Sequence, residues 1–268
     1  MENESTAEKL LNEGLELLSS EKPQKQKKGF YSLRGATALG HMKAFYYEGV
    51  CYKEGLGIYQ SDERAFERFL VAADEVPEAK YELGLCYIHG MGTEQDIDKA
   101  VACFSDAAQR GVPEAQYKLG VCYRRGEGVE QDIKTALYWY EKAASQGYLR
   151  AYHNIGIVYQ HGLGGIPTDY NKAFNYFLKA ANEESTEPYF CIGNCYLNGL
   201  GVEKNEKEAA CWFQKAAELG EPDSMFHLAW MYQEGVGVER NSELSTEYLY
   251  KAAEAGWEPA IRIIKGED

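Results

Sequence analysis

The stretch EAQYKLGVCYRRGEGVEQDIKTALYWYEKAASQG, from Glu114 to Gly147, occurs in similar form both before and after itself in the chain. Its first alanine, Ala115, marks a point that we call the anchor. Successive anchors are separated by 35, 36, 36, 37, 36 and 36 residues, a spacing typical of stacked helical hairpins. The anchors are Ala44, Ala79, Ala115, Ala151, Pro188, Ser224 and Ala260.

Each copy predicts a first helix that ends at a glycine. A small residue stands five positions after the anchor, where it allows another helix to approach closely, and a tyrosine stands three positions later. Two glycines follow, the first suited to the left-handed conformation after a helix and the second to a sharp chain reversal. The small residues are Gly49, Gly84, Gly120, Gly156, Gly193 and Ala229. The glycine pairs are Gly55 and Gly57, Gly90 and Gly92, Gly126 and Gly128, Gly162 and Gly164, Gly199 and Gly201, and Gly235 and Gly237.

A second helix is predicted to begin after each pair of glycines. Its expected N-cap residue is of a type whose side chain accepts hydrogen bonds from free backbone N–H groups. This explains three aspartates as caps rather than as catalytic acids. The predicted caps are Ser61, Asp96, Asp132, Asp169, Asn205 and Asn241.

The second helix carries aromatic residues and then paired alanines, as in ALYWYEKAASQG, where Trp139 and Tyr140 pack and Ala143 and Ala144 allow close contact. One hairpin cannot bury its own apolar face, so neighbouring hairpins must share a core. The sequence therefore predicts an all-α fold of stacked antiparallel helix hairpins with about fifteen helices.

The quoted stretch resembles the Sel-one-like repeat family, which is related to the tetratricopeptide repeat and places Ala, Leu-Gly, Tyr, Gly-x-Gly-Val, Asp, Ala and Lys-Ala-Ala at these intervals. The resemblance implies a right-handed superhelical α-solenoid that acts as a scaffold or adaptor. We expect a degenerate N-terminal capping hairpin at residues 1–42, six repeats at 43–257, and a C-terminal capping helix and tail at 258–268. A capping box from Ser5 to Glu8 is predicted to start the first helix, and the closing helix is expected at residues 259–265.

Charge and composition restrict the partners. The chain has 268 residues, of which 45% are hydrophobic, and a formal net charge of −14. This charge repels phosphate backbones and anionic membranes, so we expect no nucleic acid partner and no membrane insertion. The basic run from Lys22 to Lys28 is interpreted as a solvated connection between two helices. The acidic start, MENESTAEKLLNEG, does not resemble a secretory signal, and we expect a cytoplasmic monomer.

Catalytic and metal-binding signals are weak. Ser19 and Lys22 have a Ser-x-x-Lys spacing without its companion motifs, which we interpret as a chance match. The seven cysteines are expected to be reduced, and most occupy a repeat position that other copies fill with Val or Met. An alternative function, small-ligand or metal binding, depends on Cys191, Cys195 and Cys211. We expect no catalytic residue, metal or cofactor.

Binding is expected along the concave face, which the first helices line in this class of solenoid. An aromatic column lies two positions after the anchors, although core packing is its simpler role. The positions nine and ten after the anchors vary on a constant framework, which suits specificity. Arg124 and Arg125, with Lys118 and Asn154, can form a site for an acidic or carboxylate group. The alternative is that the arginines only offset the charges of nearby glutamates. The candidate partner-binding residues are Tyr81, His89, Tyr117, Lys118, Arg124, Arg125, His153, Asn154, Gln160 and His161.

Overall fold

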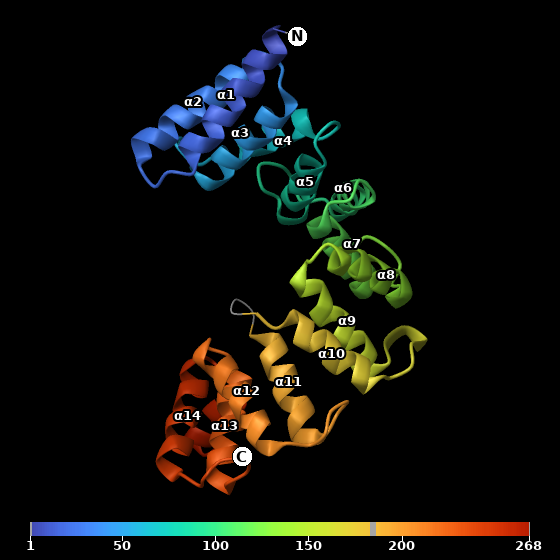
Figure 1. The fold of residues 1–268 in the computed structure, drawn as a ribbon, viewed down its shortest axis with the longest axis vertical. Coiled ribbons are helices and arrows are strands. Elements are labelled where there is room, and N and C mark those ends of the chain that lie inside the picture. The colour runs from blue at the N-terminus through green and yellow to red at the C-terminus, as the bar shows by residue number, and fades with distance from the viewer. Residues whose placement is uncertain (1, 183–185, 268) are drawn as a thin grey trace. The chain divides into compact units, whose positions relative to one another are not determined.

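The computed structural model describes residues 2–182 and 186–267. Within these residues the chain forms fifteen α-helices, one short 3-10 helix and no β-strand, which confirms the predicted all-α class (Figure 1). None of the described helices combines the length and apolar character needed to cross a lipid bilayer. The chain divides into two compact units, Met1–Ala143 and Ala144–Asp268.

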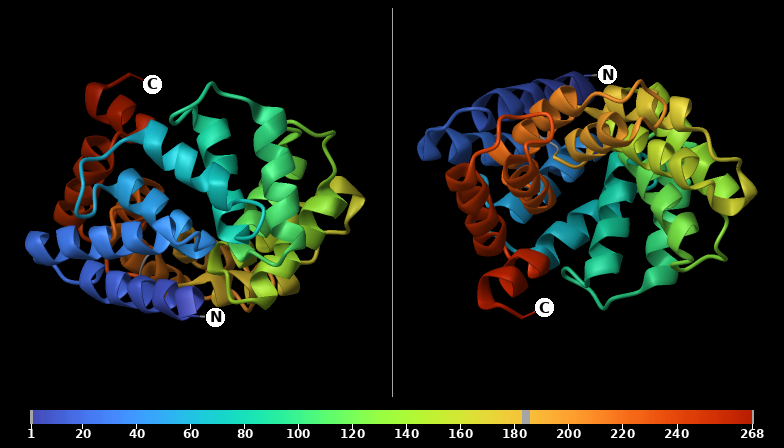
Figure 2. Two further views of the ribbon diagram at one scale, coloured as in Figure 1. Left: turned by 90° about the horizontal axis from the view of Figure 1, so that it is seen from above. Right: turned by 90° about the horizontal axis from the view of Figure 1, so that it is seen from below.

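The first unit consists of helical hairpins that stack on their neighbours. Helix α1 pairs with α2, α3 with α4, and α5 with α6, and α2 packs on α3 as α4 packs on α5. Figure 2 shows the ribbons of α1 and α2, both blue, lying side by side. The helices are α1 (Glu2–Leu18), α2 (Pro23–Ala38), α3 (Met42–Glu54), α4 (Asp62–Ala72), α5 (Pro77–His89), α6 (Ile97–Gln109), α7 (Pro113–Arg125) and α8 (Ile133–Ser145), the last of which extends into the second unit.

The second unit repeats this arrangement. Helix α9 pairs with α10, α11 with α12, and α13 with α14, and α15 packs on α14. The closing helix predicted at residues 259–265 is therefore present, whereas the division of the chain into caps and repeats stays a prediction. The elements are α9 (Leu149–His161), η1 (Leu163–Gly165), α10 (Tyr170–Ala180), α11 (Glu187–Asn198), α12 (Glu206–Glu218), α13 (Pro222–Glu234), α14 (Ser242–Glu254) and α15 (Glu258–Lys265).

The predicted helix ends are confirmed. Gly90, which follows α5, has the left-handed φ of 68°, and its N–H binds the carbonyl oxygen of Cys86. Asp96 then caps α6, because its Oδ1 accepts a hydrogen bond from the backbone N–H of Lys99 at 3.0 Å. All six predicted caps accept such bonds, and all six first glycines are left-handed.

The small residue of the first helix lies against an aromatic ring of the second. A Cβ built on Gly49 would lie 2.6 Å from Phe69 Cε1, and one built on Gly120 would lie 2.7 Å from Tyr140 Cδ1. These distances are shorter than side-chain packing permits, so glycine is required for the two helices of a hairpin to approach this closely.

The second glycine has a further role that the sequence interpretation missed. In addition to its positive φ of 67°, Gly92 packs against the backbone of Asp62 at the start of the preceding hairpin's second helix, α4. A Cβ here would overlap the carbonyl oxygen of Asp62. The same backbone contact joins Gly57 to Gln26, Gly201 to Tyr170 and Gly237 to Glu206. In these four copies the glycine therefore fixes the contact between neighbouring hairpins.

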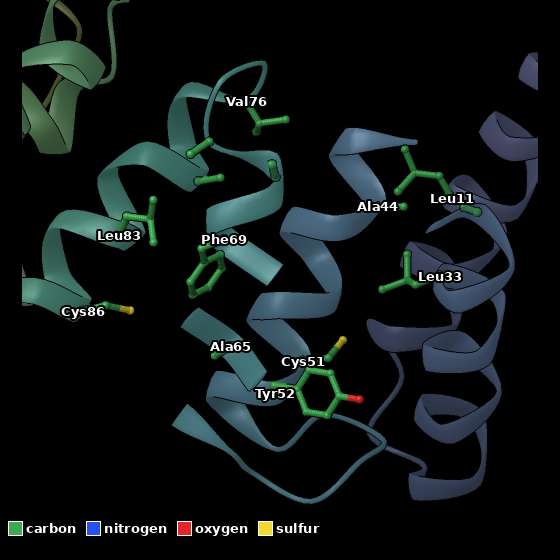
Figure 3. Close-up of a cluster of buried hydrophobic side chains, with 14 of the residues drawn as sticks. Leu11, Leu33, Ala44, Cys51, Tyr52, Ala65, Phe69, Val76, Leu83 and Cys86 are labelled. Carbon is green, nitrogen blue, oxygen red and sulfur yellow. The ribbon is translucent and has the colours of Figure 1, made fainter. Parts of the chain in front are cut away.

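The cores are shared between hairpins, as predicted. In the first unit, Leu33 of α2, Phe69 of α4 and Leu83 of α5 belong to one buried cluster (Figure 3). Phe69 is fully buried and Leu83 is 3% exposed. Because each hairpin completes the core of the next, the apolar faces are covered without a central core.

Two local predictions at the N-terminus were wrong. Helix α1 already begins at Glu2, so Ser5 lies inside it and no capping box starts there. The basic run does not connect helices, because Pro23 occupies the first turn of α2 and the lysines after it lie on that helix. These lysines are exposed, so their predicted contact with solvent is correct.

Candidate functional site

The first helices of neighbouring hairpins meet through their variable positions. Lys53, nine positions after its anchor on α3, forms an ion pair with Glu82 of α5, three positions after the next anchor, at 3.0 Å. The side chain of Glu82 is 12% exposed, so the pair is only partly open to solvent. This pair joins side chains of the consecutive first helices α3 and α5. We call the surface that the first helices of each unit present the first-helix surface.

The aromatic column packs inside the hairpins rather than standing free. Tyr81 of α5 contacts Phe104 of α6 with ring centroids 5.9 Å apart, and His153 of α9 contacts Phe177 of α10 at 5.8 Å. Tyr117 is in the same relation to Tyr140. All three column residues are half-buried, so packing is their first role and only their outer edges face solvent.

The two arginines on α7 have different surroundings. Arg125 is exposed and pairs with Glu127 at 3.3 Å, which is the charge offset considered as an alternative. Arg124 is half-buried, and its guanidinium lies beside the hydroxyl of Tyr140. Burial raises the pKa of Tyr140 to about 12, although the nearby Arg124 opposes this increase. The pair is thus not one uniform basic patch.

The other candidate residues lie in both units. In the first unit Lys118 is half-buried and His89 is exposed at the end of α5. In the second unit Asn154 and Gln160 are half-buried, and His161 is exposed at the end of α9. The grouping of Asn154 with the three basic residues of the first unit stays a prediction.

The electrostatic environment of Tyr46 shows that part of the first-helix surface is acidic. The pKa of Tyr46 is raised first by burial and then by the carboxylates of Glu82, Glu78 and Glu114. Three glutamates from α5 and α7 therefore act on one tyrosine of α3. The basic residues at the end of α7 stand in contrast to this acidic part.

Sequence reasoning missed a buried ion pair in the first full hairpin. Glu48 of α3 is 2% exposed and lies 3.3 Å from Arg68 Nε of α4, whose guanidinium also covers the ring of Phe45. The other copies have Leu or Ile at the position of Glu48, and this exception was visible in the sequence. Because breaking a buried pair leaves an uncompensated charge, this pair fixes α3 against α4.

The cysteines form no site in the described part of the chain. All seven are unpaired, and burial raises the pKa of Cys191 to about 12 and that of Cys195 to about 11, whereas metal binding requires the thiolate. Cys211 is exposed. Among the residues that the structure describes, no group of three or more His, Cys, Asp or Glu side chains is placed to hold a metal. The alternative metal-binding function therefore gains no support.

Comparisons with known proteins identify the repeat. The Sel1 repeat family model matches residues 38–75, 77–112, 113–148, 149–185, 192–221 and 222–257. The crystal structure of c5321, a protective antigen of uropathogenic Escherichia coli with an SLR fold, is 27% identical with a TM-score of 0.85, covering 97% of this chain and 56% of that one. A Sel1 repeat protein from Oxalobacter formigenes is 30% identical with a TM-score of 0.81, covering 91% and 96% respectively. A search of curated proteins finds no match.

The present chain thus spans 56% of the c5321 protein but nearly all of the protein from Oxalobacter formigenes. The ends of the matched segments are 36 or 37 residues apart, close to the spacing of the anchors, and the segments cover most of the helices. The glycine stops, the capped second helices and the stacked hairpins agree with these matches. This chain belongs to the Sel1 repeat family.

Proposed function

We propose that this protein is a non-enzymatic scaffold that binds a peptide or protein partner on the first-helix surface. Sel1 repeat proteins are generally protein-interaction scaffolds, which supports the general part of this proposal. The contact between Lys53 and Glu82 is the observation that carries the choice of surface. It joins variable side chains of consecutive hairpins into one surface on a constant framework.

We propose the same residues as the binding set, each group within its own unit. The first unit supplies Tyr81, His89, Tyr117, Lys118, Arg124 and Arg125. The second unit supplies His153, Asn154, Gln160 and His161. The basic members suit a partner with an acidic or carboxylate group, because arginine and lysine form charge-assisted hydrogen bonds with carboxylates.

The protein is further proposed to act as a cytoplasmic monomer. The seven unpaired cysteines support this compartment, because thiols stay reduced in the cytosol. Size-exclusion chromatography with light scattering on the purified chain tests the monomer, and a mass of twice 30.2 kDa would contradict it.

The function is tested by affinity capture from the native host lysate with three forms of the protein. The wild type is compared with a first-helix variant, His89→Glu with Arg125→Glu, and with a second-helix variant, Leu70→Glu with Tyr138→Glu. All four residues are exposed, so the folds should be retained. We expect a partner captured by the wild type to be lost only from the first-helix variant. Loss from the second-helix variant alone would move the binding surface to the second helices.

A further inference from the structure

Tyr140 is an exception to the repeat pattern. The fully buried ring that lies on the small residue of the first helix is Phe69, Phe104, Phe177 or Phe213 in four other hairpins and is replaced by Leu249 in the hairpin of α13 and α14. Only this hairpin adds a hydroxyl at that position. A buried hydroxyl must be hydrogen-bonded, or its desolvation destabilises the fold.

The Tyr140 hydroxyl has no hydrogen-bond partner among the described residues, and neither has the buried Nε of Arg124. Tyr140 is fully buried, whereas Arg124 is half-buried. The guanidinium of Arg124 lies beside the hydroxyl, and because a guanidinium only donates hydrogen bonds, it offers the tyrosine O–H no acceptor. Two unsatisfied donor groups, Tyr140 O–H and Arg124 Nε–H, thus lie next to each other in one hairpin.

The two groups are directed to the same place by α7. Tyr117, Gly120 and Arg124 are spaced three and four residues apart, so they lie on one stripe of the helix. The ring of Tyr140 crosses this stripe at Gly120, and its centroid lies 5.8 Å from that of Tyr117. The hydroxyl consequently emerges beside Arg124, and Arg125 adds a second positive charge within electrostatic range.

We propose that Arg124 and Tyr140 form a receptor for a carboxylate of the partner. A carboxylate has only acceptors, so one of its oxygens satisfies Arg124 Nε–H and Tyr140 O–H together, and the guanidinium supplies a charge-assisted bond. Arg124 Nε and the tyrosine hydroxyl are both buried, so the proposal includes a rotation of the half-buried Arg124 side chain that admits the carboxylate from solvent. This inference rests on the proposed function and specifies its chemistry.

The test uses the full chain and three small probes. N-acetylalanine carries a main-chain carboxylate, the α-amide of N-acetylglutamate carries a side-chain carboxylate, and the amide of N-acetylalanine carries none. Nuclear magnetic resonance of the Arg124 Nε–H, identified by its loss in Arg124→Lys, reports binding at constant ionic strength. We expect a saturable shift with the two acids and none with the neutral amide. The probe that binds more tightly shows whether the receptor prefers a C-terminal carboxylate or a side-chain carboxylate.

The matched variant is Tyr140→Phe, which restores the residue found in four other hairpins and should fold normally. We expect its affinity for the acids to fall about tenfold, as for the loss of one hydrogen bond to a charged group. Arg125→Gln should have a smaller effect, since that side chain is 56% exposed. No saturable shift in the wild type, or equal affinity in Tyr140→Phe, would overturn the receptor.

Partner capture separates this inference from the proposed function. A partner that binds the wild type, Arg124→Lys and Tyr140→Phe equally would leave the scaffold intact and refute the receptor. If the first-helix variant still captures the partner while the acids still shift the Arg124 resonance, Arg124 and Tyr140 bind carboxylates, but His89 and Arg125 do not belong to the surface that binds the partner.

Discussion

Gly193 of α11 lies against the ring of Phe213 of α12, so that a Cβ built on this glycine would lie 2.7 Å from Phe213 Cδ1. Phe213 is fully buried and cannot move aside. The hairpin of α13 and α14 has Ala229 and Leu249 at the two equivalent positions. A larger first-helix residue thus accompanies a smaller second-helix residue.

Gly193→Ala is expected to destabilise the protein by about 1–2 kcal/mol. Overpacking against Phe213 costs about 1–3 kcal/mol, and the better helix propensity of alanine offsets up to about 1 kcal/mol. Urea denaturation followed by circular dichroism measures the change. The double variant Gly193→Ala with Phe213→Leu copies the hairpin of α13 and α14 and should lose less than the two single variants together. Additive losses would show that the glycine and the ring are independent.

Gly92→Ala is expected to cost at least about 3 kcal/mol, since it combines left-handed strain with overlap on the carbonyl oxygen of Asp62. Gly90→Ala is the matched control. Gly90 has nearly the same φ, but the nearest atom to its Cβ is 3.5 Å away, so only the strain of about 1–2 kcal/mol remains. Thermal unfolding of both variants compares the two positions. Equal losses would remove the contact between hairpins as the cause.

Asp96→Asn is expected to make stability less sensitive to acid. The backbone N–H and then the side chain of Lys99 hold the pKa of Asp96 below its ordinary value of 3.8. Because the pKa of Asp96 is lower in the folded state, its carboxylate stabilises the fold at pH values above its ordinary pKa. This contribution is lost as the pH falls through the lower pKa of the folded state. Urea midpoints measured from neutral pH to below 3.8 provide the test. The reverse change, Asn205→Asp, should increase acid sensitivity, and an unchanged profile for both would contradict the capping explanation.

Cys122→Val is expected to reduce the loss of stability in alkali. Burial raises the pKa of Cys122 from 9.0 to about 11. Its stabilising contribution is complete below pH 9.0 and is lost between 9.0 and about 11, at up to about 1.4 kcal/mol per pH unit. Valine fits because Val158 fills the same repeat position and is fully buried. The free energy of unfolding is measured against pH in this window for the wild type, for Cys122→Val and for the control Cys211→Ser, whose cysteine is exposed. If the buried thiol were irrelevant, this free energy would fall equally with pH in all three proteins.

The helix ends were predictable because each depends on a few consecutive residues. Asp96 and Gly90 act on backbone groups within one turn, so their types and spacing were sufficient. Ser5 was misassigned because a capping box can be part of a helix that has already begun at Glu2. The contact of Gly92 with Asp62 could not be predicted, since it depends on how one hairpin docks on the previous one.

The candidate site was predictable only as a set of positions. The sequence showed that Arg124 and Arg125 are variable, but their different surroundings depend on how α7 packs against α8. The hydroxyl of Tyr140 was visible as an exception among phenylalanines, yet its lack of a hydrogen bond required the structure. Likewise, Glu48 was a visible exception whose partner, Arg68, lies on another helix.

The backbone contact between Gly92 and Asp62 fixes the interval between two neighbouring hairpins of the first unit. No side chain lies between the hairpins at this point, so we expect substitutions on the surface to leave the separation of these two hairpins unchanged. A partner that spans several hairpins of this unit must therefore carry its recognition groups at a matching interval. Substitutions on the surface can then change the binding preference one residue at a time, while the interval between the hairpins stays constant.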